Sequence, residues 1–241
     1  MNNPVNRCNT ILAALLLAAG IATAGYFVGR TMYNANVGIN TAEAKGLAER
    51  RVEADRALWK IQYSVSGPGS AQVARLYEKS EADQAQIVQL LLDSGFDKAE
   101  ISPGVIDYRK EEYRGDNQKL VEEKHILVGS IDVETSKVRL VAEVRAKLNK
   151  LIAQGLDIQN NAPAYHFTKL NEIKPEMVKE ATTNARIAAN EFATNAGVKV
   201  GGIRYAQQGG FVVHDIGEEY GDSKSLEKEV RLVTTITFYL D

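Results

Sequence analysis

The sequence predicts an α+β protein in which antiparallel hairpins alternate with three helices, preceded by one N-terminal transmembrane helix. Near the N-terminus, an uncharged apolar run is long enough to cross a bilayer. Further along the chain, segments in which apolar and polar residues alternate indicate strands, and segments with apolar residues three and four positions apart indicate helices. Because the two kinds of segment interleave, the class is α+β.

The apolar run extends from Thr10 to Val28, and no charged residue lies between Arg7 and Arg30. As a helix that rises ~1.5 Å per residue, this uncharged stretch reaches about 33 Å, enough to cross the hydrocarbon core of a membrane. We therefore predict that the chain is attached to a membrane through this helix. The expected parts of the chain are a short tail (1–9), the anchor (10–29), a spacer (30–41) and a water-soluble body (42–241).

A cleaved signal peptide is the alternative to an anchor, because Ala22-Thr23-Ala24 offers a small-residue cleavage site. The run continues past that site to Val28, an extension that a spanning helix needs and a signal peptide does not. We therefore favour an uncleaved anchor, and either interpretation implies that the body is exported. The anchor residues are Ile11, Leu12, Leu15, Leu16, Leu17, Ile21, Phe27 and Val28.

Charge and cysteine content narrow the class of the body. The chain has 29 Lys and Arg against 31 Asp and Glu, so it lacks the basic excess of a nucleic-acid surface. The single cysteine, Cys8, precedes the apolar run, so the body contains no disulfide. Its stability must come from packing and from pairing of strands.

Period-two alternation predicts strands over 42–52 and 56–66, joined by 53–55, with Trp59 as a core residue of the second. A helix is expected next from Ser70, as its N-cap, to about Asp93. Gly95-Phe96 ends this helix in a pattern that recurs at two further positions, and each time an apolar residue follows the glycine. The two recurrences are Gly155-Leu156 and Gly197-Val198.

A hairpin is predicted over 100–114 and 120–134, turning at Gly115-Asp116-Asn117. Its outer half is charged on both faces, so it cannot lie across a core and should project as a two-stranded arm. Such an arm is either a solvated hairpin or a surface that binds another subunit. The candidate interface residues are Tyr108, Arg109, Lys110, Tyr113 and Arg114.

A second helix is expected over 137–154 with Ser136 as its cap, followed by a strand over 165–170. A third helix is expected to begin at Pro175, a favoured first helical position. Its inner face is rich in small residues, which would let its axis approach a neighbour closely. This face comprises Met177, Ala181, Ala185, Ala188, Phe192 and Ala196, and the final strands are expected over 199–206, 211–214 and 228–240.

Catalytic and metal-binding motifs are missing from the sequence. The three histidines fall on separate predicted strands, without the spacing of a zinc site. The acidic pairs lie in polar contexts typical of solvated surface. We therefore predict no catalytic, metal or cofactor-binding residue. The histidines are His125, His166 and His214, and the acidic pairs are Glu111-Glu112, Glu122-Glu123 and Glu218-Glu219.

Several short motifs resemble the SIMPL-domain family of bacterial envelope proteins. Lys45-Gly-Leu-Ala-Glu-Arg50, followed by Trp59, is similar to the opening signature of that family, and Asn184-Ala185-Arg186 with Gln208-Gly209-Gly210-Phe211 is similar to its helix and strand signature. Lys228-Glu-Val-Arg-Leu-Val233 resembles its last strand. The resemblance implies a periplasmic or cell-surface α+β domain, linked to oxidative-stress tolerance and to large oligomers. It brings no active site or cofactor.

Two functions from different classes follow. The first is a non-enzymatic envelope protein, tethered to the inner membrane with its body in the periplasm, that associates with copies of itself through the arm and sheet edges. The second is a periplasmic domain that binds or hydrolyses a small ligand between sheet and helices. Its pocket would be lined by Trp59, Tyr165 and His166.

Overall fold

The computed structural model of the chain describes residues 4–36, 40–115, 117–218 and 220–241. Its first element is the helix α1 (Pro4–Asn36), within which Thr10–Ala35 is long and apolar enough to cross a membrane or to serve as a signal sequence. The predicted apolar helix is therefore present. It is longer than expected, because 30–36 of the predicted spacer is helical, whereas 37–39 and the first three residues of the predicted tail lie outside the described residues.

The chain divides into two compact units. The first unit contains the described residues up to Ala48 together with 178–210 and 232–241. The second contains 49–177 and 211–231. Because each unit is built from segments distant in the sequence, local patterns alone could not separate them.

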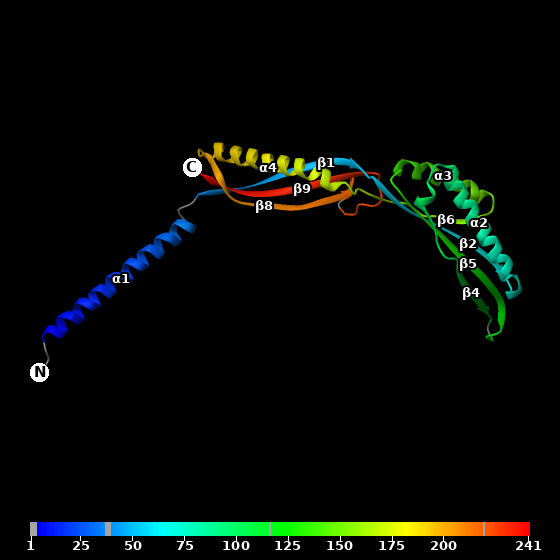
Figure 1. Cartoon of the computed structure of the whole chain (residues 1–241), viewed down its shortest axis with the longest axis horizontal. Helices are drawn as coiled ribbons and strands as arrows, with labels where there is room; N and C mark the ends of the chain where they lie inside the picture. Colours follow the sequence, from blue (N-terminus) through cyan, green and yellow to red (C-terminus); the bar gives the residue numbers. More distant parts are fainter. Residues whose placement is uncertain (1–3, 37–39, 116, 219) are drawn as a thin grey trace. The chain divides into compact units, whose positions relative to one another are not determined.

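The first unit contains α1, most of a three-stranded sheet and most of one helix that packs along this sheet. The strand order is β1 (Thr41–Glu53), β9 (Glu227–Leu240), β8 (Val200–Asp215), so β1 and β8 are edges. The helix α4 (Leu170–Asn195) runs along this sheet in Figure 1. β1 and β9 each bury alternate residues, as period-two strands covered on one face should. The strands predicted over 199–206 and 211–214 are one continuous strand of 16 residues.

The small-residue face of α4 packs against β1, as predicted, at a very short distance. A Cβ atom added to Gly46 would lie 1.8 Å from the carbonyl oxygen of Ala181 and 2.4 Å from the amide nitrogen of Ala185, so the helix backbone occupies that space. Asn184 also donates from its side-chain amide to the carbonyl of Leu47 at 2.8 Å. The buried helix residues are Met177, Ala181, Ala185, Ala189 and Ala193.

Two expectations for α4 are wrong. Ala188, Phe192 and Ala196 are exposed, because the buried stripe keeps a strict spacing of four and does not change to three. The helix also begins at Leu170, which leaves Pro175 inside it. As the sixth residue of the helix, Pro175 lies beyond the first four N–H groups that lack partners, so it removes one backbone hydrogen bond that the helix would otherwise make to Asn171.

The second unit has a curved sheet with two helices on one face (Figure 1). Its strand order is β3-β5-β2-β6, with β4 paired to β5 and β7 to β2. Trp59 is 1% exposed in the core between this sheet and the helices, as predicted. The elements are β2 (Arg56–Pro68), α2 (Val73–Asp93), β3 (Ile101–Pro103), β4 (Asp107–Arg114), β5 (Leu120–Thr135), α3 (Val138–Ala153), β6 (Asp157–Asn160) and β7 (Ala164–His166), with short 3-10 turns at Ser70–Gln72 and Lys98–Glu100.

All three predicted glycine endings of helices are confirmed. Gly95, Gly155 and Gly197 have φ values of 106°, 98° and 74°. In each case the next residue donates its N–H to a carbonyl five residues back, as Phe96 does to Leu91 at 3.2 Å. This is the hydrogen-bond pattern of the Schellman motif, which satisfies carbonyls that the helix end leaves free.

Both predicted N-caps are wrong. Ser70 lies within a 3-10 turn that precedes α2, and its side chain makes no capping hydrogen bond. At α3, the cap position is Lys137, and Thr135 rather than Ser136 provides the hydroxyl that accepts the Lys137 N–H, at 2.9 Å. The chain enters α2 through an extra 3-10 turn, which the sequence pattern does not reveal.

Gly46→Ala should destabilise the first unit by at least about 2 kcal/mol, because the new methyl group would have to push α4 away from β1. Hydrogen exchange of the amides in 181–193 is expected to accelerate. Gly202→Ala is the matched control, since nothing lies within 4 Å of its added Cβ. Equal protection of α4 in the two variants would contradict the close approach.

Candidate functional site

The predicted β4–β5 hairpin is present, and we use the name arm for its outer half, 108–114 with 119–125. It is two-stranded only at its tip, contrary to the prediction, because β2 pairs with the other edge of β5 as far as Pro68 opposite Lys124. All eight residues of β4 are exposed, and β4 pairs with β5 from Asp107 opposite Val128 to Arg114 opposite Leu120. The turn is closed by hydrogen bonds between Gly115 and Lys119 and between Gln118 and Gly115. Asp116, part of the predicted turn, lies outside the described residues.

Ion pairs within the arm join four of its charged side chains. Lys110 contacts Glu112 and Glu123, each at 3.0 Å, and Arg114 contacts Glu112 at 2.6 Å. Hydrogen bonds from Arg114 and Lys110 lower the pKa of Glu112, and those to Glu112 and Glu123 raise the pKa of Lys110. Among the described residues, Arg109 has no ion-pair partner. The arm therefore offers less free charge than its sequence suggests.

A hydrogen-bonded chain joins Tyr108, His125 and Glu123 on one face of the arm. The hydroxyl of Tyr108 lies 2.6 Å from Nδ1 of His125, and Nε2 of His125 lies 2.6 Å from Oε1 of Glu123. The second oxygen of Glu123 is held by Lys110. His125 is 2% exposed, whereas Tyr108 is 51% exposed.

The partners fix the direction of these hydrogen bonds. A carboxylate only accepts, so Nε2 of His125 carries the proton that binds Glu123. In the neutral imidazole, Nδ1 is then an acceptor, and the hydroxyl of Tyr108 donates to it. The hydrogen bond from Lys110, followed by that from His125, lowers the pKa of Glu123 and keeps it a carboxylate. The three side chains therefore have the polarity of a base-activated hydroxyl.

The hydrogen-bonded set of three side chains was not predicted from the sequence, although part of the pattern is visible there. Glu123 and His125 are two positions apart on a strand, so they share a face. Tyr108 reaches His125 only because the hairpin register places Lys110 opposite His125 and thus Tyr108 diagonally across from it. A search of the hairpin for cross-strand diagonals would have found it.

The residues predicted to line an alternative pocket lie outside the arm, and two of the three belong to the core of the second unit. Trp59 and Tyr165 are 1% and 7% exposed and belong to the core, and Trp59 donates from Nε1 to the carbonyl of Asn161 at 3.1 Å. His166 is half-buried on β7, opposite Arg56 of β2.

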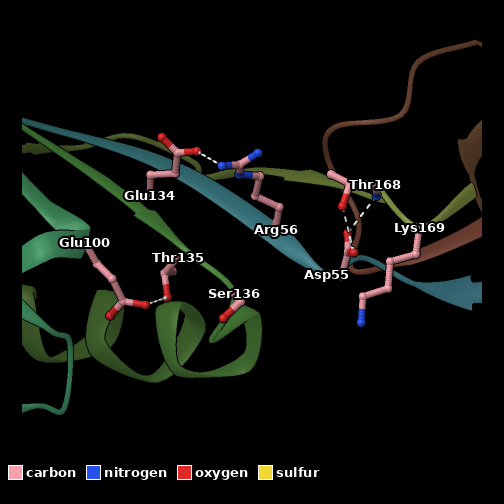
Figure 2. A pocket seen from close by; sticks show the side chains of 8 residues that line it. All are labelled: Asp55, Arg56, Glu100, Glu134, Thr135, Ser136, Thr168 and Lys169. Atoms are coloured by element: carbon pink, nitrogen blue, oxygen red, sulfur yellow. Dashed lines mark hydrogen bonds and ion pairs between the residues drawn. The ribbon is translucent and has the colours of Figure 1, made fainter.

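A polar cavity of about 330 Å³ is lined in part by Arg56, the residue opposite His166 (Figure 2). Arg56 and Glu134 form an ion pair across its wall, and Asp55 accepts hydrogen bonds from the N–H and hydroxyl of Thr168 at 2.7 and 2.8 Å. In Figure 2, the ammonium group of Lys169 points away from the other labelled side chains. The cavity walls are charged and hydroxylic, which suits a small polar ligand better than an apolar one. The lining residues are Asp55, Arg56, Glu100, Glu134, Thr135, Ser136, Thr168 and Lys169.

An ion pair is buried where β8 ends and β9 begins. Nζ of Lys228 lies 2.5 Å from Oδ1 of Asp215, and the two side chains are 0% and 3% exposed. The backbone N–H groups of Lys224 and Ser225 donate to the same carboxylate at 2.9 and 3.0 Å. Burial raises the pKa of Asp215, but the hydrogen bonds from Lys228 and from these amides outweigh it, so the pKa is lowered.

The histidines do not meet. His125 lies in the arm, His166 on β7 and His214 near the end of β8, where its Nε2 is 3.7 Å from Glu229. Over the described residues, no three His, Cys, Asp or Glu side chains gather as metal ligands. Glu219 of the third acidic pair lies outside those residues.

A model of the SIMPL family, whose description is a protein of unknown function (DUF541), matches residues 43–230. The match covers most of the chain and all strands from β1 to the first residues of β9. The chain therefore belongs to the SIMPL family, as its motifs indicated. No curated protein matches it.

Asp215→Asn should destabilise the second unit by about 3–5 kcal/mol, because it leaves the ammonium group of Lys228 buried without its counter-charge. Urea unfolding followed by the fluorescence of Trp59, which lies in the same unit, measures the loss. The double variant with Lys228→Met as well should recover much of it, since both charges are then gone. A loss under 1 kcal/mol for Asp215→Asn alone would contradict the pairing.

The ion pair between Asp215 and Lys228 should also make the stability of the protein depend on pH in the acid range. Because the pKa of Asp215 is lowered in the folded protein, its contribution is present above the unfolded pKa of ~3.9 and is lost as pH falls through the folded value. Asp215→Asn should therefore show less loss of stability below about pH 4 than the parent chain.

Proposed function

We propose that the protein is a membrane-tethered, non-enzymatic envelope protein that associates with copies of itself through the open edge strand β8. The observation that carries the proposal is the length and composition of this edge. β8 is 16 residues long, and its neighbour in the three-stranded sheet is β9 on one side only. The other side presents a row of backbone N–H and C=O groups to any strand that can pair with them.

The side chains of β8 do little to discourage pairing. Between Arg204 and His214 there is no charged residue, whereas exposed edges are usually protected by charges, especially lysine. Apolar side chains are also exposed along it, including Ile203 at 50%, Tyr205 at 58% and Val212 at 51%. The opposite edge, β1, carries Glu43, Lys45 and Glu49 on exposed positions. A second copy of β8 is a strand of matching length and of the same uncharged character.

The arm is the alternative interface, but the geometry of the arm supports association less well than the open edge of β8 does. Two of its basic side chains, Lys110 and Arg114, are already paired within the arm, so an incoming subunit would have to compete with these contacts. Exposed ion pairs contribute little to association. The candidate interface residues Tyr108, Arg109, Lys110, Tyr113 and Arg114 remain a prediction that the experiment below separates from β8.

Attachment to the membrane through α1 completes the proposal. None of the residues in the apolar span is buried against the rest of the chain, as a lipid-facing helix requires. We place the body in the periplasm of a bacterium, which is consistent with the resemblance of its motifs to envelope proteins and with the apolar helix α1. Any part that the protein plays in oxidative-stress tolerance would follow from assembly, because the body has no cysteine thiol to oxidise.

Replacing Tyr205 and Gln207 by lysine should reduce the mass of the oligomer that the full-length protein forms in detergent. Light scattering over a concentration series measures this mass. Two ammonium groups on each paired strand would repel their symmetry mates, so we expect at least a tenfold weaker association. A parent chain that is monomeric at every concentration would overturn the proposal.

Two controls locate the interface. Ala188→Lys with Asn190→Lys adds the same charge to exposed positions of α4 and should leave the mass unchanged. Reversing the charge of Arg109, Lys110 and Arg114 to glutamate should also leave it unchanged. A smaller mass for the arm variant and an unaltered mass for the β8 variant would move the interface to the arm.

The intact mass of protein purified from bacterial membranes tests the anchor. We expect a chain that retains 10–29, because the apolar run extends past the possible cleavage site after Ala24. A chain that begins at Gly25 would identify the run as a signal peptide. Leu16→Arg, which places a charge in mid-span, should reduce membrane attachment if the helix spans the bilayer.

A further inference from the structure

The chain of hydrogen bonds through Tyr108, His125 and Glu123 is not needed for self-association through β8. Buried histidines commonly serve as structural hydrogen-bonding groups, but here one ring nitrogen is held by a carboxylate and the other by an exposed hydroxyl. This is the order of groups in a nucleophile, a general base and a residue that orients the base. Tyrosine takes the place of the usual serine.

We propose that Tyr108 is a nucleophilic site that accepts an acyl group from an activated ester or thioester, with His125 as its general base and Glu123 as the positioning residue. The phenolic oxygen forms a bond to the acyl carbon, and the bond from that carbon to the alkoxide or thiolate leaving group breaks. The phenolic proton passes to Nδ1 of His125. The imidazolium then returns this proton to the leaving group or to water, so the product is an acyl-tyrosine.

Geometry explains why this tyrosine would react in preference to others. Its hydroxyl is 2.6 Å from the base, within hydrogen-bond reach, while half of the side chain is open to a reactant. Glu123 holds Nε2 of His125 at 2.6 Å and stabilises the positive charge that develops on the ring. Lys110, at 3.0 Å from the other oxygen of Glu123, keeps that carboxylate in place.

Every charged group described around the histidine fits this assignment. From its own strand, Glu123 faces Nε2, and from β4, Tyr108 faces Nδ1. Lys110, opposite His125 in the hairpin, binds Glu123 and Glu112 rather than the ring. No described cation contacts Nδ1, so the lone pair that must take the proton remains available.

Tyr113 is a natural internal control five residues further along the same strand. It is 52% exposed against 51% for Tyr108, so the two side chains are equally accessible. Its hydroxyl donates to Glu111 at 3.1 Å, and that hydrogen bond raises its pKa. No base of the histidine type is near it among the contacts described. The two residues therefore differ mainly in the group that receives the proton.

Acetylation of the full-length protein in detergent by p-nitrophenyl acetate tests the proposal. Trypsin cleaves after Arg109 and Lys110, so Tyr108 and Tyr113 fall on different peptides and their acetylation rates can be measured in one sample by mass spectrometry. We expect Tyr108 to react at least tenfold faster, since general-base assistance contributes about 10²–10⁴-fold. Equal rates at the two tyrosines would overturn the proposal without any substitution.

Substitutions then assign the roles. Glu123→Gln should bring the rate at Tyr108 down to that at Tyr113, because an amide no longer stabilises the imidazolium. Glu112→Gln is the matched control: it removes another carboxylate bound to Lys110 that does not contact His125, and should leave the rate unchanged. An unchanged rate in Glu123→Gln, or an equal fall in both variants, would contradict the positioning role. Hydrogen exchange across β4 and β5 shows whether each variant keeps the hairpin folded.

Discussion

The antiparallel pairing of β2 with β5 is the constraint on which the second unit depends. It runs without a break from Ala57 opposite Thr135 to Pro68 opposite Lys124. A slip of one residue would turn every core side chain to the opposite face, so the register is determined by which residues must be buried. Its tightest point is Tyr63 opposite Gly129, where an added Cβ would lie 2.1 Å from the tyrosine ring. The ring can lie across the neighbouring strand only because that position is glycine.

The first unit depends on a similar absence of side chains. A single helix covers the sheet, and its buried positions are alanine, so little apolar area is available and the helix compensates by close approach at Gly46. Close packing of backbone against backbone gains dispersion contacts that larger side chains would provide elsewhere. Independently of the face that the helix covers, β8 is an edge because no further described strand pairs with it in the three-stranded sheet. The open edge that we assign to association is thus a consequence of how this unit is built.

The arm combines a structural and a chemical feature of the β4–β5 hairpin. Toward its tip, β5 continues to pair with β4, and four of the charged side chains there form ion pairs with one another. Within that charged surface, His125 is nearly fully buried, and its two nitrogens are both satisfied. His125 lies on β5 between Lys110 of β4 and Gly67 of β2, so the sheet itself accounts for its burial. We consider it a site because its Nδ1 binds the hydroxyl of a half-exposed tyrosine. The proposed association and the proposed acyl acceptor use different surfaces and are independent.

Local patterns in the sequence determined the α+β class, the apolar helix, the strands β1 and β2, the projecting hairpin and the three glycine endings, because each depends on neighbouring residues and on hydrogen bonds within a few positions. The family motifs could also be recognised in the sequence, because each is a run of neighbouring residues. Only the tertiary structure decided that the body forms two units, that α4 buries Ala189 and Ala193, and that Tyr108 meets His125. These features depend on register and on contacts between distant segments, and a one-residue shift in either changes which side chains meet. Sequence periodicity does not specify the register of distant segments, whereas packing of the complete chain does.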